Sequence, residues 1–373
     1  MKSGALTEAE ESTWVEKTGR VVEAHQDLVR PKVQLLLALI CGLVVLVILA
    51  IAVGSYDISL LKILRSLLGF ENGPQRIVVW DIRMPRIVAA LVAGCGLGLS
   101  GLATQSLLRN PLASPFTLGI SQGAAFGAAF SIVVMGAGRM QESALRTADA
   151  NSFTVHSIYA VTLFAFLGAI TATVVILILA RFKKMSPEAI ILAGIALSSL
   201  FTSGTILVQY FATEVEIARV VFWTFGDVAR SNWREIGLLG FVTVLVLAYF
   251  VFNRWNLNAI TTGEETARGL GVDVNRVRLL GMFLAALVAA LATAFHGIIA
   301  FLGLLAPHIG RRLAGADHAL LIPYACVIGA MVLLFADTLG RMLVGSGTLP
   351  VGVLTSFMGA PVFLYLLVRG LNR

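Results

Sequence analysis

Long apolar runs recur along the chain and set the strongest limit on its fold. They cover residues 33–54, 86–108, 116–137, 157–181, 188–211, 235–253, 277–296, 320–343 and 350–369. Most are about 20 residues long, enough for a helix to cross the hydrocarbon core of a bilayer. The segment from His296 to Ile309 is also apolar, but glycines and Pro307 interrupt it, so we expect a short or bent helix there. The runs predict an all-α polytopic membrane protein with about ten transmembrane helices.

The composition agrees with a membrane protein and excludes several other classes. Only 13% of the residues are charged, about half the share in soluble domains, and 58% are hydrophobic. The net charge of +7 comes from basic residues in the loops that flank the runs, so a nucleic-acid-binding surface is not indicated. Cys41, Cys95 and Cys326 lie in separate apolar runs without a CxxC pair, and we interpret them as packing residues.

Charge also predicts domains and orientation. Residues 1–32 are polar and read as a cytoplasmic N-terminal tail with room for a short surface helix, followed by one transmembrane domain over residues 33–373. Ten crossings place both termini on the same side. Most of the 28 basic residues then fall in inner segments if the N-terminus is inside, so we expect both termini in the cytoplasm.

A glycine-rich run and a polar hinge stand out between Arg83 and Gly123. Gly94, Gly98 and Gly101 would let a neighbouring helix backbone approach closely. The run breaks at Asn110-Pro111-Leu112, and the chain then becomes apolar again. Such a span ending in a short hinge is typical of a moving part of a transporter.

The loop between residues 253 and 278 contains a second candidate element. Thr262 to Val272 has a charged start, small residues and a glycine stop, which predicts a short helix capped by Gly271. Many surface helices share this pattern, but its position between two membrane spans makes it more specific.

Polar groups inside the last apolar runs are few. Asp337 and Arg341 are four residues apart, so they can form an ion pair on one helical face. We interpret His308, beside Pro307, as fixing a turn or capping a helix, and His296 as a packed polar residue. The five histidines show no HxxxH or HxH spacing, so we expect no tightly bound metal.

Taken together and in this order, these segments resemble the FecCD permease family, the membrane subunits of ABC importers for iron-siderophores, haem and cobalamin. The similarity extends from about Trp80 to Arg369 and includes the G-E-x-x-A-x-x-L-G pattern that begins at Gly263. It implies the type II ABC importer permease fold in a bacterial inner membrane. It also implies three partners: ATP-binding cassette ATPase subunits, a periplasmic or lipid-anchored substrate-binding protein, and a second permease subunit, with a homodimer favoured over a heterodimer.

The resemblance assigns roles to four groups of residues. Coupling to the ATPase is implied for Gly263, Glu264, Ala267, Arg268, Leu270 and Gly271. Docking of the binding protein is implied for Arg83, Arg86 and Arg341, which could instead anchor lipid headgroups. The cytoplasmic gate is implied at Asn110, Pro111, Leu112, Ser186 and Pro187. Ser198, Ser199, Thr202, Ser203 and Gln209 are candidates for lining the pathway and could equally serve helix packing.

The sequence says less about the energy source and the cargo than about the fold. No G-x-x-x-x-G-K-[ST] loop occurs, so ATP and Mg are expected on the partner ATPase, and the chain is expected to be a transport subunit without a tightly bound cofactor and not an enzyme. A ferric siderophore is the first expectation for the cargo, then haem, then cobalamin. Gly226-Asp227 departs from the family pattern, which leaves the cargo open. An ion-coupled secondary transporter would need unpaired acids in the membrane, and a membrane enzyme would need clustered catalytic groups.

Overall fold

The structure is a computed structural model, and it describes residues 8–54, 59, 62, 65–66, 69–70, 73–137, 153–183, 186–343 and 349–371. Helices and short connections make up this part of the chain, and no strand occurs within it. The helices are α1 (Glu8–Ala52), α3 (Pro74–Ile77), α4 (Met84–Leu107), α5 (Ile120–Val133), α7 (Phe153–Lys183), α8 (Pro187–Tyr210), α9 (Glu214–Thr224), α10 (Trp233–Phe252), α11 (Arg254–Thr262), α12 (Glu264–Gly269), α13 (Val274–His296), α14 (Leu302–Ala314), α15 (His318–Leu343) and α16 (Val351–Leu371).

These helices confirm the all-α membrane fold. Among the described residues, 7 helical segments are long and apolar enough to cross a bilayer, and α5 and the described part of α16 are shorter apolar helices. With α14, they account for every predicted span. The short helix expected after His296 is present as α14, but it covers Leu302–Ala314 and not residues 296–309, because residues 297–301 are irregular. Gly297 and Phe301, at φ 78° and 64°, explain the delayed start, and Pro307 lies inside the helix without ending it.

Helix α4 is the centre of the bundle, and its glycines make that possible. A Cβ atom added at Gly94 would lie 2.5 Å from the carbonyl oxygen of Gly329 on α15. One added at Gly98 would lie 2.3 Å from the Ala325 oxygen, and one at Gly101 only 1.9 Å from the Gly303 oxygen of α14. Any larger residue would push these helices apart, so the predicted close approach is confirmed.

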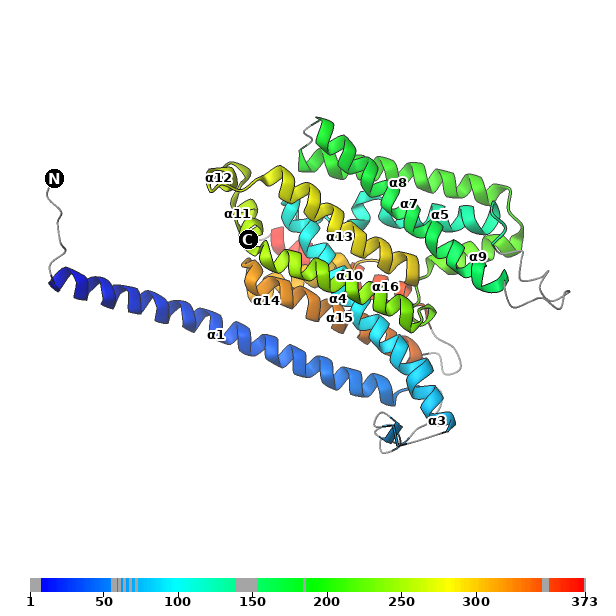
Figure 1. Ribbon diagram of the computed structural model, residues 1–373, viewed down its shortest axis with the longest axis horizontal. Coiled ribbons are helices and arrows are strands. Elements are labelled where there is room, and N and C mark those ends of the chain that lie inside the picture. Colours follow the sequence, from blue (N-terminus) through cyan, green and yellow to red (C-terminus); the bar gives the residue numbers. More distant parts are fainter. Residues whose placement is uncertain are drawn as a thin grey trace.

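Helix α1 is one continuous helix of 45 residues that joins the predicted tail to the first span. Its N-terminal part extends beyond the bundle, while its C-terminal part lies beside α15 (Figure 1). The hydroxyl of Tyr324 on α15 donates to the Lys32 carbonyl at 2.6 Å, near the point where α1 leaves the bundle.

The bundle has two distinct ends (Figure 1). We call the end that carries α11, α12 and the C-terminus the α12 end, and the opposite one, which carries α3, the α3 end. The pattern of the long apolar runs did not predict α9 or α11. Helix α9 nevertheless has a local signal, since Thr213 and Glu216 form a capping box in which the Thr213 N–H donates to the Glu216 carboxylate at 2.9 Å.

Candidate functional site

The predicted hinge after α4 is an ordered turn at the α12 end. Arg109 has φ 49°, in the left-handed region that residues other than glycine rarely adopt outside turns. The side-chain oxygen of Asn110 accepts from the Leu112 N–H at 2.8 Å, an Asx turn that fixes the chain ahead of Pro111. Pro111 and Leu112 are exposed, Leu112 to 45%. The hinge is therefore structured but open on its surface.

The structure brings the other predicted gate segment close to this hinge. Ser186 caps α8 by accepting from the Ala189 N–H at 3.4 Å, and Pro187 is the first residue of the helix. Helix α8 packs against the 3₁₀ turn Pro115–Leu118 that follows the hinge, where a Cβ at Gly194 would lie 2.1 Å from the Thr117 oxygen. Helix α8, which begins with the second gate segment, therefore packs against the turn that follows the hinge.

Helix α12 matches its sequence prediction closely. The N–H of Gly271 donates to the Arg268 carbonyl at 2.9 Å and that of Val272 to the Ala267 carbonyl at 3.0 Å, the two bonds of a Schellman motif. Gly271 has φ 83°, as such a stop requires. The side chain of Ala267 is fully buried, whereas Arg268 is exposed and Leu270 is 70% exposed.

Glu264 lies differently from the other members of the predicted coupling group. Its carboxylate forms an ion pair with Arg278 of α13 and a longer one, 3.6 Å, with Arg268. Arg278 is buried and also donates from Nε to the carbonyl of Leu107, the last residue of α4, at 3.1 Å. No role was predicted for Arg278 from the sequence. The available signal was an arginine one turn inside an apolar helix, where a charge requires a partner.

Further polar contacts hold the end of α4. The Arg311 side chain donates to Gln105 at 3.2 Å, and His318 contacts the Ser106 hydroxyl at 2.7 Å. The other ring nitrogen of His318 contacts Asn258 of α11 at 2.6 Å. Asn258 in turn donates to Asp317 at 2.9 Å. Burial raises the pKa of Asp317, but hydrogen bonds from the Ala319 N–H and the Asn258 amide, together with the nearby charges of His318 and Arg254, outweigh it, so the net pKa is lowered.

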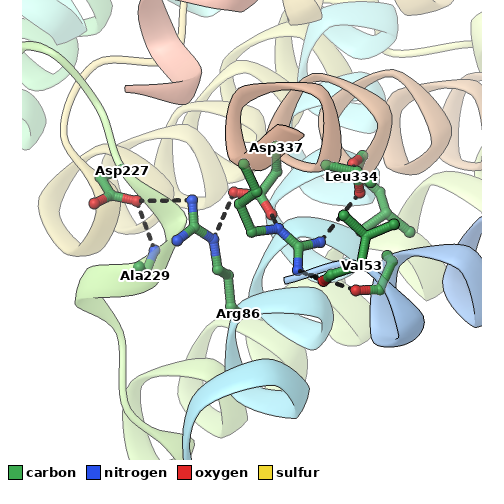
Figure 2. A network of polar contacts seen from close by, with 9 residues as sticks. Val53, Arg86, Asp227, Ala229, Leu334 and Asp337 are labelled. Carbon is green, nitrogen blue, oxygen red and sulfur yellow. Dashed lines mark hydrogen bonds and ion pairs between the residues drawn. The ribbon is translucent and has the colours of Figure 1, made fainter. Parts of the chain in front are cut away.

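The three predicted docking arginines lie at the α3 end, and all are engaged within this chain. Figure 2 shows the Arg86 side chain between Asp227 and Asp337. Arg86 donates to Asp337 at 2.8 Å and lies 3.9 Å from Asp227, which is partly exposed. Arg341 pairs with Asp337 at 3.3 Å, which confirms the predicted i, i+4 pair.

The arginines of the α3 end also cap α1. An α-helix leaves its last carbonyls without backbone partners. Arg341 donates to the carbonyls of Ala50 and Val53, both at 3.0 Å. Arg83 donates to those of Ile51 at 2.5 Å and Ala52 at 3.3 Å. A docking role would therefore require these guanidinium groups to exchange internal partners for external ones.

The predicted pathway residues of α8 are divided between exposed and half-buried positions. Ser199, Thr202 and Ser203 are exposed, and Ser198 and Gln209 are half-buried. The Ser198 and Ser199 hydroxyls donate to the carbonyls four residues earlier, at 2.8 and 3.1 Å. The exposed side of the helix also carries large apolar side chains, namely Leu192, Ile195, Leu200, Ile206, Leu207 and Tyr210.

The histidines lie apart from any metal-like cluster. Within the residues that the structure describes, no group of three or more His, Cys, Asp or Glu side chains could hold a metal ion. His296 is packed as predicted, with Nε2 at 3.0 Å from Ser231 and Nδ1 at 2.9 Å from the Ala292 carbonyl. The prediction that His308 fixes a turn or caps a helix is wrong. Helix α14 starts five residues before Pro307, so His308 lies in the helix interior.

Comparison with known proteins gives a consistent result. The model of the FecCD transport family matches residues 42–369. A protein of Methanocaldococcus jannaschii named as an ABC transporter permease is 47% identical over 324 residues, which are 87% of this chain and 91% of that protein. The Fe(3+)-citrate import permease YfmE of Bacillus subtilis is 35% identical, covering 89% and 93% of the two chains. The hemin transport permease HmuU of Yersinia pestis is 33% identical, covering 89% and 96%.

The structural comparison agrees. A solved structure of a metal-chelate type ABC transporter in an inward-facing conformation superimposes with a TM-score of 0.75 at 30% identity, covering 90% of this chain and 99% of that one. Other relatives are named for molybdate and vitamin B12.

Proposed function

Because this chain belongs to the FecCD transport family, whose members are membrane-spanning permeases of ABC importers, we propose that its cargo is an iron chelate, either a ferric siderophore or haem. The observation that carries this proposal is that two relatives that align over almost their whole length are named for the import of Fe(3+)-citrate and hemin. Cobalamin is the alternative, since a vitamin B12 permease is 32% identical.

The α12 end suits a cytoplasmic position. Basic side chains gather there on α11, α12 and the first turn of α13, as Arg254, Arg268 and Arg276. This orientation places the N-terminal tail and the C-terminus in the cytoplasm of a bacterial inner membrane. It also presents Arg268 and Leu270 to the ATPase subunits, which would bind ATP and Mg and leave this chain a transport subunit without catalytic groups or a cofactor of its own.

A second permease subunit suits the exposed side of α8. Lipid tails also accommodate apolar side chains such as Leu192, Leu200 and Tyr210, each more than 60% exposed within one chain, so small and weakly polar residues are the better sign of a helix contact in a membrane. The weakly polar Ser199 and Thr202 lie on the same side, so a homodimer formed through α8 would place small hydroxyl groups among apolar side chains along the pathway.

Import then requires the two ends to act in sequence. A substrate-binding protein delivers the chelate at the α3 end, where Arg83, Arg86 and Arg341 lie. Nucleotide binding moves the ATPase subunits and with them α12. The hinge at Asn110–Leu112 and the neighbouring turn at Ser186–Pro187 open or close the path on the cytoplasmic side.

The test is uptake by the reconstituted complex of this chain, its ATPase and its binding protein in liposomes. Ferric siderophore, haem and cobalamin are offered in parallel, with and without internal ATP. ATP-dependent uptake of an iron chelate supports the proposal, and uptake of cobalamin alone contradicts the assigned cargo. Uptake that needs no ATP and disappears with an uncoupler would instead indicate a secondary transporter.

A further inference from the structure

We propose that Arg278 is the positioning residue that transmits the movement of α12 to the end of α4 and so to the hinge at Asn110–Leu112. This inference rests on the proposed function, because it gives α12 the coupling role argued above. It goes further by assigning the connection between the coupling helix and the gate to one side chain and its contacts.

The contacts of Arg278 link elements that are far apart in sequence. Its Nη2 group pairs with Glu264, the first residue of α12, and its Nε donates to the carbonyl of Leu107, the last residue of α4, at 3.1 Å. Leu107 is 171 residues away. Arg278 itself lies on the buried side of α13, with 7% of its surface exposed. One planar group therefore connects the start of α12 to the end of α4.

An arginine is needed for this double contact. A guanidinium offers donors in a rigid fork and can serve a carboxylate and a carbonyl together, whereas the compact ammonium of lysine is a single point of charge. The buried position also makes the contacts stronger than they would be in water, because little solvent competes for them.

Apart from its packing on α11 and its short chain connections to α11 and α13, α12 has little other attachment to the bundle. Of its six residues, only Ala267 is buried, and a methyl group can slide over its neighbours. The Glu264–Arg278 ion pair therefore fixes the direction in which α12 and α13 move together, which the packing of the single Ala267 methyl group does not.

The position of the Leu107 carbonyl governs the hinge. Only Leu108 and Arg109 separate α4 from Asn110, and the left-handed conformation of Arg109 leaves this turn with little freedom. A shift of Arg278 would thus be felt at the hinge.

The experiment compares variants of the intact permease–ATPase complex in lipid nanodiscs. Hydrogen–deuterium exchange is measured for peptides covering residues 262–272 and 104–114, with and without a non-hydrolysable ATP analogue. Transport per ATP hydrolysed is measured for the same variants in liposomes. The variants are Arg278→Gln, Arg278→Lys and Glu264→Gln. Arg276→Gln is the matched control, since Arg276 is an exposed arginine in the first turn of the same helix.

In the unmodified complex, the nucleotide analogue changes exchange in both segments. In Arg278→Gln and Glu264→Gln, the change at 262–272 persists while that at 104–114 disappears, and transport per ATP falls roughly tenfold. Arg278→Lys recovers part of the lost transport, and Arg276→Gln stays within about twofold of the unmodified complex.

Two outcomes overturn the inference. If the nucleotide analogue still changes hydrogen–deuterium exchange at residues 104–114 in Arg278→Gln, then other residues connect α12 to α4. If Arg278→Gln raises exchange equally with and without nucleotide, the residue is only structural. Failure of the proposed function looks different, because the unmodified complex itself would then show no nucleotide response at 262–272 and no ATP-dependent uptake.

Discussion

The two ends of the molecule use the same chemistry, arginine against carboxylate and carbonyl, for different purposes. At the α3 end, Asp337 is fully buried between Arg86 and Arg341, and the network joins three long helices. At the α12 end, Arg278 joins a six-residue helix with an exposed surface to the start of a hinge. Asp337, the central acid of the first network, is fully buried, whereas the side chain of Glu264, the acid of the second, is 26% exposed and belongs to a short helix, so we expect the second connection to move more readily.

The largest effect is expected from removing the centre of the clamp. Asp337→Asn leaves the guanidinium of Arg341 without its carboxylate and leaves Arg86 only the more distant Asp227, and breaking a buried pair in this way costs about 3–5 kcal/mol. Thermal unfolding of the purified protein in detergent measures the loss. Asp227→Asn is the matched control, because Asp227 lies 3.9 Å from Arg86 with its side chain 29% exposed, so its removal should cost much less. Equal losses for both variants would contradict the view that burial distinguishes the two acids.

The next effect concerns the exposed surface of α12. Leu270→Asp places a charge on a side chain that is 70% exposed in this chain and that we expect to be buried by the ATPase. Loss of such a central contact weakens association by roughly 30-fold. Co-purification and a binding isotherm with the ATPase measure it, while thermal unfolding of the permease alone stays unchanged. Normal affinity would exclude Leu270 from the interface.

A smaller effect is expected when an arginine of the α3 end is reversed. Arg83→Glu should weaken docking of the substrate-binding protein roughly tenfold, because the charge that steers a carboxylate partner changes sign. Surface plasmon resonance measures docking, and co-purification shows that the permease–ATPase complex still assembles. The same variant also loses the donors to the Ile51 and Ala52 carbonyls, so Arg83→Gln separates the two effects. Unchanged docking in Arg83→Glu would limit Arg83 to capping α1.

The smallest effect is expected on the exposed side of α8. The Ser199 hydroxyl donates to the Ile195 carbonyl of its own helix, so Ser199→Ala should change stability by about 0.5 kcal/mol or less and leave uptake within about twofold. Thermal unfolding and liposome uptake check this. A large loss of uptake at unchanged stability would show that the hydroxyl contacts the cargo directly.

Features that depend on local spacing were predictable from the sequence. The close approach at Gly94, Gly98 and Gly101, the stop at Gly271 and the Asp337–Arg341 pair follow from residue type and a separation of a few positions. In each case the residues that create the feature lie within one helix or one turn, so their spacing can be read from the sequence.

Contacts between distant segments were not predictable in the same way. Nothing in the sequence around Arg278 indicates the carbonyl of Leu107, and nothing around Asn258 indicates His318, because tertiary packing alone brings these residues together. The inward orientation of Glu264 was missed for the same reason. Residue spacing favours an exposed acid at the start of α12, and only the buried partner on α13 overrides it.

The capping of α1 has a consequence for the order in which the protein is built. Arg83 follows the Ile51 and Ala52 carbonyls by 32 and 31 residues, so it can cap them while the ribosome is still making the early part of the chain. Arg341 follows Ala50 and Val53 by 291 and 288 residues. Until α15 is made, Arg83 can cap the Ile51 and Ala52 carbonyls, but the carbonyls of Ala50 and Val53 lack the Arg341 donor. The last carbonyls of α1 can therefore all be capped only after nearly the whole chain has been synthesised.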